Sequence, residues 1–329
     1  MIKIISLLPF LYILLNASQL IVGAGGFDVS KKGTHYSFKN HETNTTRINI
    51  TEVLQKEAKN VNSVTIWITR NWQEEWYDAN EVQQNIINKG YIPVFVFYYF
   101  ADEISPTFIQ DNKTTYYQQL KKFVHYLKKI DGQKIVILNP EYNMFGCEKL
   151  QSMNELFIKS FKIVRKDPQT IVGPCVGDFG NYSLTNEPQE WKLFDPSLNK
   201  AVKEADFIAF QEMRALTRNS KQDILNTPQR AYYLSKYLYK TYKKPTMLAY
   251  LAISSYGKDA EEIQAEVYKS FLHYLPKMQK EAKLIFFGIF HYFDYPSHVG
   301  YFNEAEEFFG VVRKDGTKKP SYKYFTKIH

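Results

Sequence analysis

The sequence lacks the compact motifs that mark several common chemistries. It contains no His-Glu-x-x-His pattern and no tight His/Cys cluster, so nothing indicates a zinc site. It contains no Gly-x-Ser-x-Gly elbow, which removes the motif evidence for a serine hydrolase. No Gly-rich phosphate loop follows the first expected strand, which disfavours a nucleotide-binding fold. We therefore expect neither a metal ion nor a cofactor.

The chain also lacks a segregated block of charge, although its formal net charge is +8. Lys and Arg are interleaved with Asp and Glu, which predicts a mixed surface and no nucleic-acid partner. Only two cysteines, Cys147 and Cys175, are present. In an exported protein such a pair suggests one disulfide, and the two positions fall on neighbouring βα units. Two buried free thiols are the alternative.

Residues 1–24 have the pattern of a secretory signal peptide. Lys3 gives a positively charged start, 4–15 is mainly apolar, and 22–24 offers small residues for cleavage. The apolar run is short for a membrane span, and no later stretch reaches 18 apolar residues. We therefore expect a secreted, extracellular protein (periplasmic in a bacterium), monomeric and with no membrane span after cleavage. An uncleaved N-terminal anchor is the alternative.

Short apolar segments alternate with amphipathic helical segments along the rest of the chain. Such alternation predicts a parallel sheet, and eight units favour a closed (β/α)₈ TIM barrel, an α/β fold, as a single domain over 25–329. An open doubly wound sheet is the alternative. The expected strands are 25–30, 63–69, 93–100, 134–138, 170–174, 206–210, 245–251 and 284–290.

Polar and aromatic residues follow these strands, at the end where a barrel of this kind carries its chemistry. Carboxylates and amides bond to hydroxyl groups, while Trp and Tyr stack on the C–H faces of sugars, so this rim suits a polyhydroxylated ligand. Glu141 is the first ionisable residue after the buried run 134–138, and Glu212 follows 206–210 in the same way. The expected substrate contacts are Trp72, Tyr98, Asn143, Gln211 and Tyr292.

Glycoside hydrolysis needs two carboxyl groups that flank one bond. Glu141 is the expected general acid/base, and Glu212 is the expected second carboxylate. Asp178 and Asp294 are the reserves for that second role. The alternative for Glu212 is an ion pair with a rim arginine such as Arg70 or Arg214.

Asn139-Pro140-Glu141 at the end of the fourth strand resembles the acid/base site of a clan of (β/α)₈ glycoside hydrolases that holds cellulases and mannanases. The segment 308–322 resembles the end of such barrels, where a closing helix follows. The resemblance implies a retaining mechanism, but two departures prevent its transfer. Pro140 separates the Asn from the Glu, and the seventh strand, 245–251, lacks the family's nucleophile Glu.

Asn139-Pro140-Glu141 also resembles a degraded Asp-x-Glu motif of chitinase-like barrels, in which the substrate's acetamido group is the nucleophile. Taken together, these patterns predict a secreted glycoside hydrolase that cleaves O-glycosidic bonds of a polysaccharide or oligosaccharide. A non-catalytic barrel that binds glycans or a partner protein is the alternative, because the seventh strand has no carboxylate.

Overall fold

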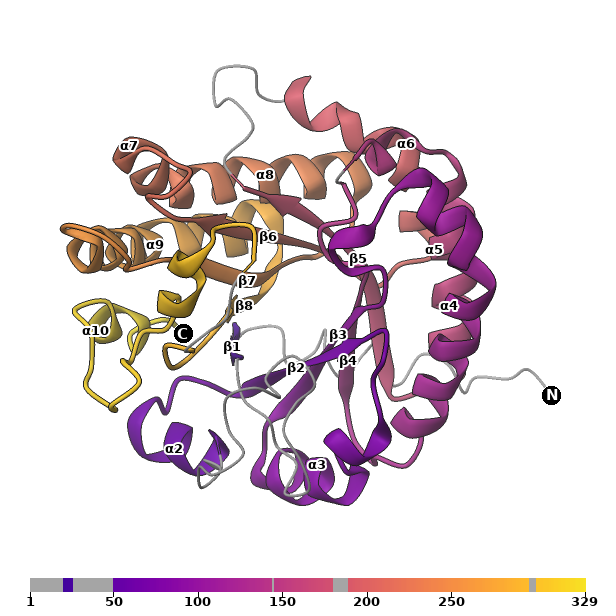
Figure 1. The fold of residues 1–329 in the computed structure, drawn as a ribbon, viewed down its shortest axis with the longest axis horizontal. Coiled ribbons are helices and arrows are strands. Elements are labelled where there is room, and N and C mark those ends of the chain that lie inside the picture. Colours follow the sequence, from indigo (N-terminus) through magenta and orange to yellow (C-terminus); the bar gives the residue numbers. More distant parts are fainter. Residues whose placement is uncertain (1–19, 26–49, 144, 180–188, 296–299) are drawn as a thin grey trace.

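Eight parallel strands form a closed barrel in the computed structural model, which describes residues 20–25, 50–143, 145–179, 189–295 and 300–329 (Figure 1). The strands follow one another around the barrel in sequence order, and β1 pairs with β8 through Gly23 and Gly288 to close it. The expected single-domain (β/α)₈ fold is therefore confirmed. The strands are β1 (Ile21–Ala24), β2 (Ser63–Thr69), β3 (Ile92–Tyr98), β4 (Lys134–Leu138), β5 (Thr170–Asp178), β6 (Ile208–Arg214), β7 (Thr246–Ile253) and β8 (Leu284–Ile289).

The helices surround the barrel in the same order, from α2 in indigo to α10 in yellow (Figure 1). In the long helix after β3, Ser105 caps the first turn by accepting the Phe108 N–H, and Pro106 occupies the first helical position. None of the described helices is long and apolar enough to cross a membrane. The helices are α2 (Ile50–Glu57), α3 (Ala79–Asn85), α4 (Pro106–Leu127), α5 (Ser152–Val164), α6 (Asp195–Leu198), α7 (Lys221–Leu225), α8 (Thr227–Tyr242), α9 (Ala260–Ala282) and α10 (Tyr322–Phe325).

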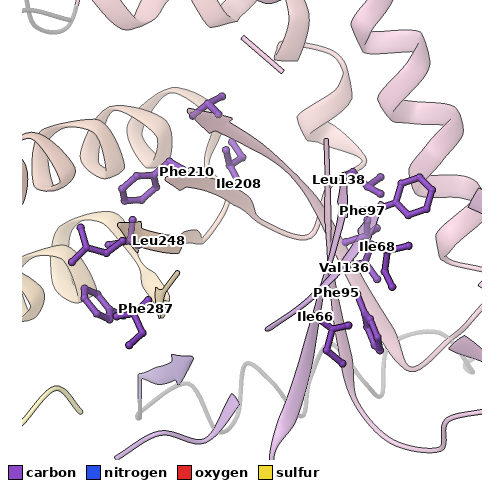
Figure 2. Close-up of a cluster of buried hydrophobic side chains, with 14 of the residues drawn as sticks. Ile66, Ile68, Phe95, Phe97, Val136, Leu138, Ile208, Phe210, Leu248 and Phe287 are labelled. Atoms are coloured by element: carbon purple, nitrogen blue, oxygen red, sulfur yellow. The ribbon is translucent and has the colours of Figure 1, made fainter. Parts of the chain in front are cut away.

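The core has two parts, because successive side chains of a strand point to opposite faces of the sheet. One set packs between the barrel and the helices. Figure 2 shows members of this outer set, with Phe97 and Leu138 on one side of the barrel and Phe210 and Phe287 on the other. A second set fills the barrel interior and includes residues such as Val96. Which set a residue joins therefore decides whether it can reach the mouth of the barrel.

Two strand boundaries differ from the sequence prediction. The first strand was expected at 25–30, but β1 is Ile21–Ala24, and residues 26–49 lie outside the described part. The sixth strand was expected to end at residue 210, but β6 continues to Arg214. Glu212 and Arg214 remain in the strand because buried ion pairs engage both side chains. Gln211 and Glu212 are thus strand residues that point to opposite faces, and not neighbours on one loop.

The two cysteines are free and buried. Cys147 belongs to the outer set and Cys175 to the barrel interior, so the sheet separates the two thiols. The expectation of a disulfide was wrong, and the alternative of two buried thiols is confirmed.

Candidate active site

The chain turns sharply where β4 ends, and this turn aims Glu141 at the barrel mouth. Asn139 and Glu141 both have a positive φ, of 47° and 63°, on either side of Pro140. Positive φ is uncommon for residues other than Gly and is most easily tolerated by Asn and Asp, so Glu141 is held in a conformation it would rarely adopt alone. The Asn139 amide donates to the Tyr116 hydroxyl on α4 (3.1 Å) and so faces the helices. Pro140 therefore changes the geometry of the motif as well as its length. In the turn around it, the Asn139 side chain points away from the mouth.

Two tyrosines hold the Glu141 carboxyl group. The Tyr250 hydroxyl of β7 donates to Glu141 Oε1 at 2.6 Å, and the Tyr98 hydroxyl of β3 lies 3.4 Å from Oε2. Tyr98 also donates to Asp102 Oδ1 at the shorter distance of 2.7 Å. Burial raises the pKa of both phenols well above its ordinary value, so both remain protonated donors. Tyr98, an expected substrate contact, therefore lies beside the expected acid.

Aromatic rings line the mouth around this carboxyl group. The Trp67 ring packs against Tyr98, Tyr250 and Phe290, with centroids 5.3–5.4 Å apart. Trp67 and Phe290 are both only partly buried. Ring faces of this kind beside a carboxyl group suit the apolar faces of a sugar, whose hydroxyl groups then meet the polar atoms.

The electrostatic surroundings favour the protonated form of Glu141. Its side chain is buried, and burial is the main reason that its pKa rises to about 7. The hydrogen bond from Tyr250 lowers this pKa, whereas the negative charges of Asp102 and Glu306 raise it. Burial likewise raises the pKa of Glu306, in the loop after β8, to about 7. Glu141 is thus a carboxyl group that can hold a proton near neutral pH.

Gln211 and Asn143 lie close to Glu141 but differ in what their amides do. The Gln211 amide is fully buried beside Gly177 of β5, and within the described ranges neither its nitrogen nor its oxygen has a hydrogen-bond partner. Asn143 uses both amide atoms on the Gly177 backbone, donating at 2.8 Å and accepting at 2.6 Å. Gln211 therefore keeps donor and acceptor capacity for a ligand, whereas Asn143 ties the loop after β4 to the end of β5.

The two remaining expected contacts are placed elsewhere. Trp72 belongs to the outer set and packs on Phe123 and Tyr126 of α4. Tyr292 is also in the outer set, where its hydroxyl donates to Glu57 of α2 (3.1 Å). Each of Trp72 and Tyr292 therefore follows its strand on the face that packs against helices, and the structure does not bring either side chain to Glu141.

Glu212 lies in a buried ion-pair cluster outside the barrel. Arg214 contacts Glu212 at 2.8 Å and Asp178 at 2.9 Å, and Arg230 of α8 contacts Asp178 at 2.8 Å. Burial raises the pKa of Glu212 well above its usual range, and the Asp178 charge adds to this rise. The structure does not bring Glu212 to Glu141, and the alternative of an ion pair with Arg214 describes it.

The reserve carboxylates are also engaged in ion pairs. Asp178 binds the two arginines of that cluster, and Asp294 binds the buried Lys319. The described residues contain no group of three or more His, Cys, Asp or Glu side chains that could hold a metal ion. The acidic groups that influence Glu141 are instead Asp102 and Glu306.

The sequence places Tyr250 at the end of the seventh strand, but Tyr250, Trp67 and Glu306 were not among the expected site residues. Tyr250 lies on β7, and alternation along that strand was the signal available for it. Glu306 lies in a short 3₁₀ helix, Glu304–Phe308, that contains three glutamates. Nothing in that acidic run distinguishes the buried Glu306 from the exposed Glu304 or the half-buried Glu307.

Solved structures with the same fold include glycoside hydrolases and a glucanosyltransferase. An exo-β-1,4-mannosidase from Opitutaceae bacterium strain TAV5 aligns with a TM-score of 0.63 and 13% identity, over 94% of this chain and 59% of the mannosidase chain. Xylanase B from Clostridium stercorarium F9 aligns with a TM-score of 0.58 and 13% identity, over 95% and 98% of the two chains. A β-1,3-glucanosyltransferase from Rhizomucor miehei aligns with a TM-score of 0.56 and 15% identity, over 92% and 96%.

No family model matches the sequence, and a search of curated proteins finds no match. At 10–15% identity, likeness to solved structures establishes the fold. The expected resemblance to (β/α)₈ glycoside hydrolases is thus confirmed for the architecture, and the chain is a divergent barrel whose structural neighbours are glycoside hydrolases.

Proposed function

We propose that this protein is a secreted glycoside hydrolase that cleaves O-glycosidic bonds of a polysaccharide or oligosaccharide, with Glu141 as general acid. The observation that carries the proposal is the state of Glu141. It is a buried carboxyl group at the carboxyl end of β4, with a pKa of about 7, bonded to Tyr250 and surrounded by aromatic rings. A general acid works best when its pKa lies near the working pH.

The hydrogen-bond geometry supports Glu141 Oε2 as the oxygen that carries the proton. Oε1 accepts the Tyr250 O–H, so that oxygen acts as an acceptor. The Tyr98 hydroxyl lies closer to Asp102 Oδ1 (2.7 Å) than to Oε2 (3.4 Å), so it donates to Asp102 and its oxygen can accept a hydrogen bond from a protonated Oε2. When a glycosidic oxygen replaces this contact, the Oε2 proton passes to the leaving group as the C–O bond breaks.

A panel of polysaccharides and aryl glycosides tests the proposal directly. The purified protein is incubated with β-mannans, xylans, β-glucans and chitin, and released reducing ends are measured. We expect release from at least one of these substrates. Binding to a glycan without release of reducing ends, across the whole panel, would contradict hydrolysis.

A non-catalytic glycan-binding barrel is the second candidate. The observation in its favour is Tyr250, which stands on the strand where the related clan carries its nucleophile and bonds directly to Glu141. A barrel that had lost its second carboxylate would retain the aromatic rings and the buried Gln211 amide as binding groups. The same panel separates the two candidates.

The raised pKa of Glu141 predicts how activity depends on pH. A general acid must be protonated, so turnover falls as pH rises through about 7, and this descending limb belongs to Glu141. The Tyr250 hydrogen bond lowers the pKa of Glu141. We therefore expect Tyr250→Phe to move the limb to higher pH, measured as kcat/KM from pH 5 to 10, because kcat/KM reports the groups of the free enzyme. An unchanged or lower midpoint would contradict the assignment of the limb to Glu141.

Secretion is proposed from the N-terminal pattern, and β1 restricts where a leader can be removed. Cleavage after Ala24 would delete Ile21–Ala24, which pair with both β2 and β8. We therefore expect the mature chain of an exported protein to retain Leu20 and the residues that follow it. N-terminal sequencing measures this directly, and an active mature chain that starts at Gly25 would contradict it.

A further inference from the structure

The side-chain amide of Gln211 is fully buried next to the mouth of the barrel, and within the described ranges neither of its polar atoms has a hydrogen-bond partner. Burying an unpaired amide costs the folded state the hydrogen bonds that water supplied before folding. A second glutamine, Gln264 of α9, is equally buried but fully paired. Its nitrogen donates to two backbone carbonyls, at 2.7 and 3.1 Å, and its oxygen accepts the Ser321 hydroxyl at 2.6 Å. The fold can therefore satisfy a buried glutamine, and Gln211 is left unpaired at one particular place.

The register of the strands places this amide beside Glu141. Gln211 of β6 lies level with Gly177 of β5 on one side and with Tyr250 of β7 on the other. The Tyr250 hydroxyl donates to Glu141 Oε1 at 2.6 Å. A Cβ added to Gly177 would lie 2.9 Å from Gln211 Nε2 and 3.3 Å from the Glu141 Cα, so both atoms border the same point. The amide nitrogen and the turn that carries the proposed acid are thus neighbours by direct packing.

Of the three amides that the described residues place around Glu141, Gln211 is the one that can serve a ligand. Asn139 faces the helices, where its nitrogen donates to a tyrosine hydroxyl of α4 at 3.1 Å. Asn143 uses both its nitrogen and its oxygen on the Gly177 backbone. Gln211 keeps a free donor and a free acceptor in the barrel interior. A sugar hydroxyl or acetamido group also offers both a donor and an acceptor, so such a group is the complementary partner.

We propose that Gln211 recognises the polar substituent on C2 of the sugar whose glycosidic bond is cleaved, either a hydroxyl or an acetamido group. This assignment rests on the hydrolysis proposed above and adds the part of the substrate that the site selects. C2 is bonded to the anomeric carbon, so its substituent is the hydroxyl or acetamido group of that ring closest to the oxygen that Glu141 protonates. The last side-chain torsion of a glutamine is soft, so the amide can turn toward a ring in the mouth. Hydrogen bonds to this substituent strengthen in the transition state of glycoside hydrolysis.

Gln211→Met tests the unpaired amide without any substrate, with Gln264→Met as the matched control. Methionine has the length of glutamine but no amide to leave unpaired. We therefore expect the thermal unfolding midpoint of Gln211→Met to rise by about 2–6 °C. The midpoint of Gln264→Met should fall, because the hydrogen bonds of a paired amide are lost. Gln211→Leu provides a second apolar variant. If neither Gln211 variant is more stable than the wild type, the amide is satisfied in the free protein and the proposal is overturned.

Substrates that differ only at C2 test the recognition itself. Aryl glycosides of the sugar that the panel identifies are compared with their 2-deoxy analogues, and kcat/KM is measured for each. Gln211→Met should lower kcat/KM roughly 100-fold for the substituted glycoside but by no more than about twofold for the 2-deoxy analogue, in which the partner is absent. Gln264→Met should change both substrates by the same factor. Activity on chitin identifies the acetamido group as the partner, and activity on mannan, xylan or β-glucan identifies the hydroxyl group.

The outcomes separate this inference from the function on which it rests. An active wild type in which Gln211→Met loses the same factor on both substrates overturns the C2 assignment and leaves hydrolysis intact. A wild-type protein that is inert on the whole panel overturns hydrolysis. In that case calorimetric titration with glucose, mannose, N-acetylglucosamine and 2-deoxyglucose decides the recognition. Binding that requires a C2 substituent and is lost in Gln211→Met sustains the C2 contact, and any other result overturns it.

Discussion

Replacing Glu141 by Gln is expected to lower kcat by roughly 10²–10⁴-fold, because the variant cannot give a proton to the leaving oxygen. The loss should be greatest for substrates with poor leaving groups, such as natural sugars. It should be smallest for aryl glycosides with strongly acidic phenols, which depart without protonation. Steady-state kinetics on both kinds of substrate measure the difference. Equal losses on the two kinds of substrate would contradict a general acid.

The same variant should fold at least as well as the wild-type protein. Gln can still accept the Tyr250 hydroxyl at Oε1, so the main hydrogen bond of the side chain persists. The raised pKa means that the folded state holds the Glu141 proton more tightly than the unfolded state, from the ordinary value of 4.5 to about 7. The wild-type protein therefore loses stability as pH rises through this interval, by up to about 3 kcal/mol from this group.

Gln has no charge to bury, so Glu141→Gln should lack this part of the pH dependence. Thermal unfolding at pH 5 and pH 8 measures it, and we expect the variant to exceed the wild type at pH 8. A variant that loses both turnover and folding would show that Glu141 is structural. Asp102→Asn provides a second test, because Asp102 is exposed and its negative charge raises the pKa of Glu141.

The architecture was predictable because it depends on a pattern that recurs eight times. Each buried strand is a short apolar run, and each connection contains an amphipathic helix. An error at the boundary of one strand therefore does not change the predicted number of βα units. The first strand illustrates such an error. Ile21–Ala24 is apolar and directly follows an apolar segment, so the sequence pattern assigned these residues to the signal peptide and not to a strand.

The site was predictable only where the position of a residue at the end of a strand determined its role. Glu141 and Tyr98 follow directly from strand ends, and Gln211 points into the barrel through alternation along β6. Glu212 and Trp72 also stand near the ends of their strands, but both side chains point toward the helices and away from the barrel mouth. Their direction depends on where each strand ends, which polar partners and helix contacts decide. Glu306 depends on how a loop folds back over the mouth, and no periodic pattern encodes that contact.

Removing the carboxyl group of Asp178 is expected to destabilise the protein by about 3–5 kcal/mol, because two buried arginines would lose their shared partner. Asp178 accepts Arg214 Nη2 at 2.9 Å and Arg230 at 2.8 and 3.1 Å, and all three side chains are buried. With Glu212, the cluster contains two acids and two bases. In Asp178→Ala two guanidinium groups would face one carboxyl group whose pKa burial already raises.

Urea unfolding at pH 7 measures this cost, and Glu261→Ala provides the matched control. Glu261 pairs with Arg313 at 2.5 Å, but the two side chains are 28% and 38% exposed, so the loss of that pair should cost about 1 kcal/mol or less. Similar costs for the two variants would contradict a buried cluster. Because Asp178 and Arg214 lie at the ends of neighbouring strands β5 and β6, the cluster fixes the strand ends beside Gly177 and Gln211. Glu212→Gln should accordingly lower stability while the folded fraction keeps its kcat, which separates a residue that supports the site from one that acts in it.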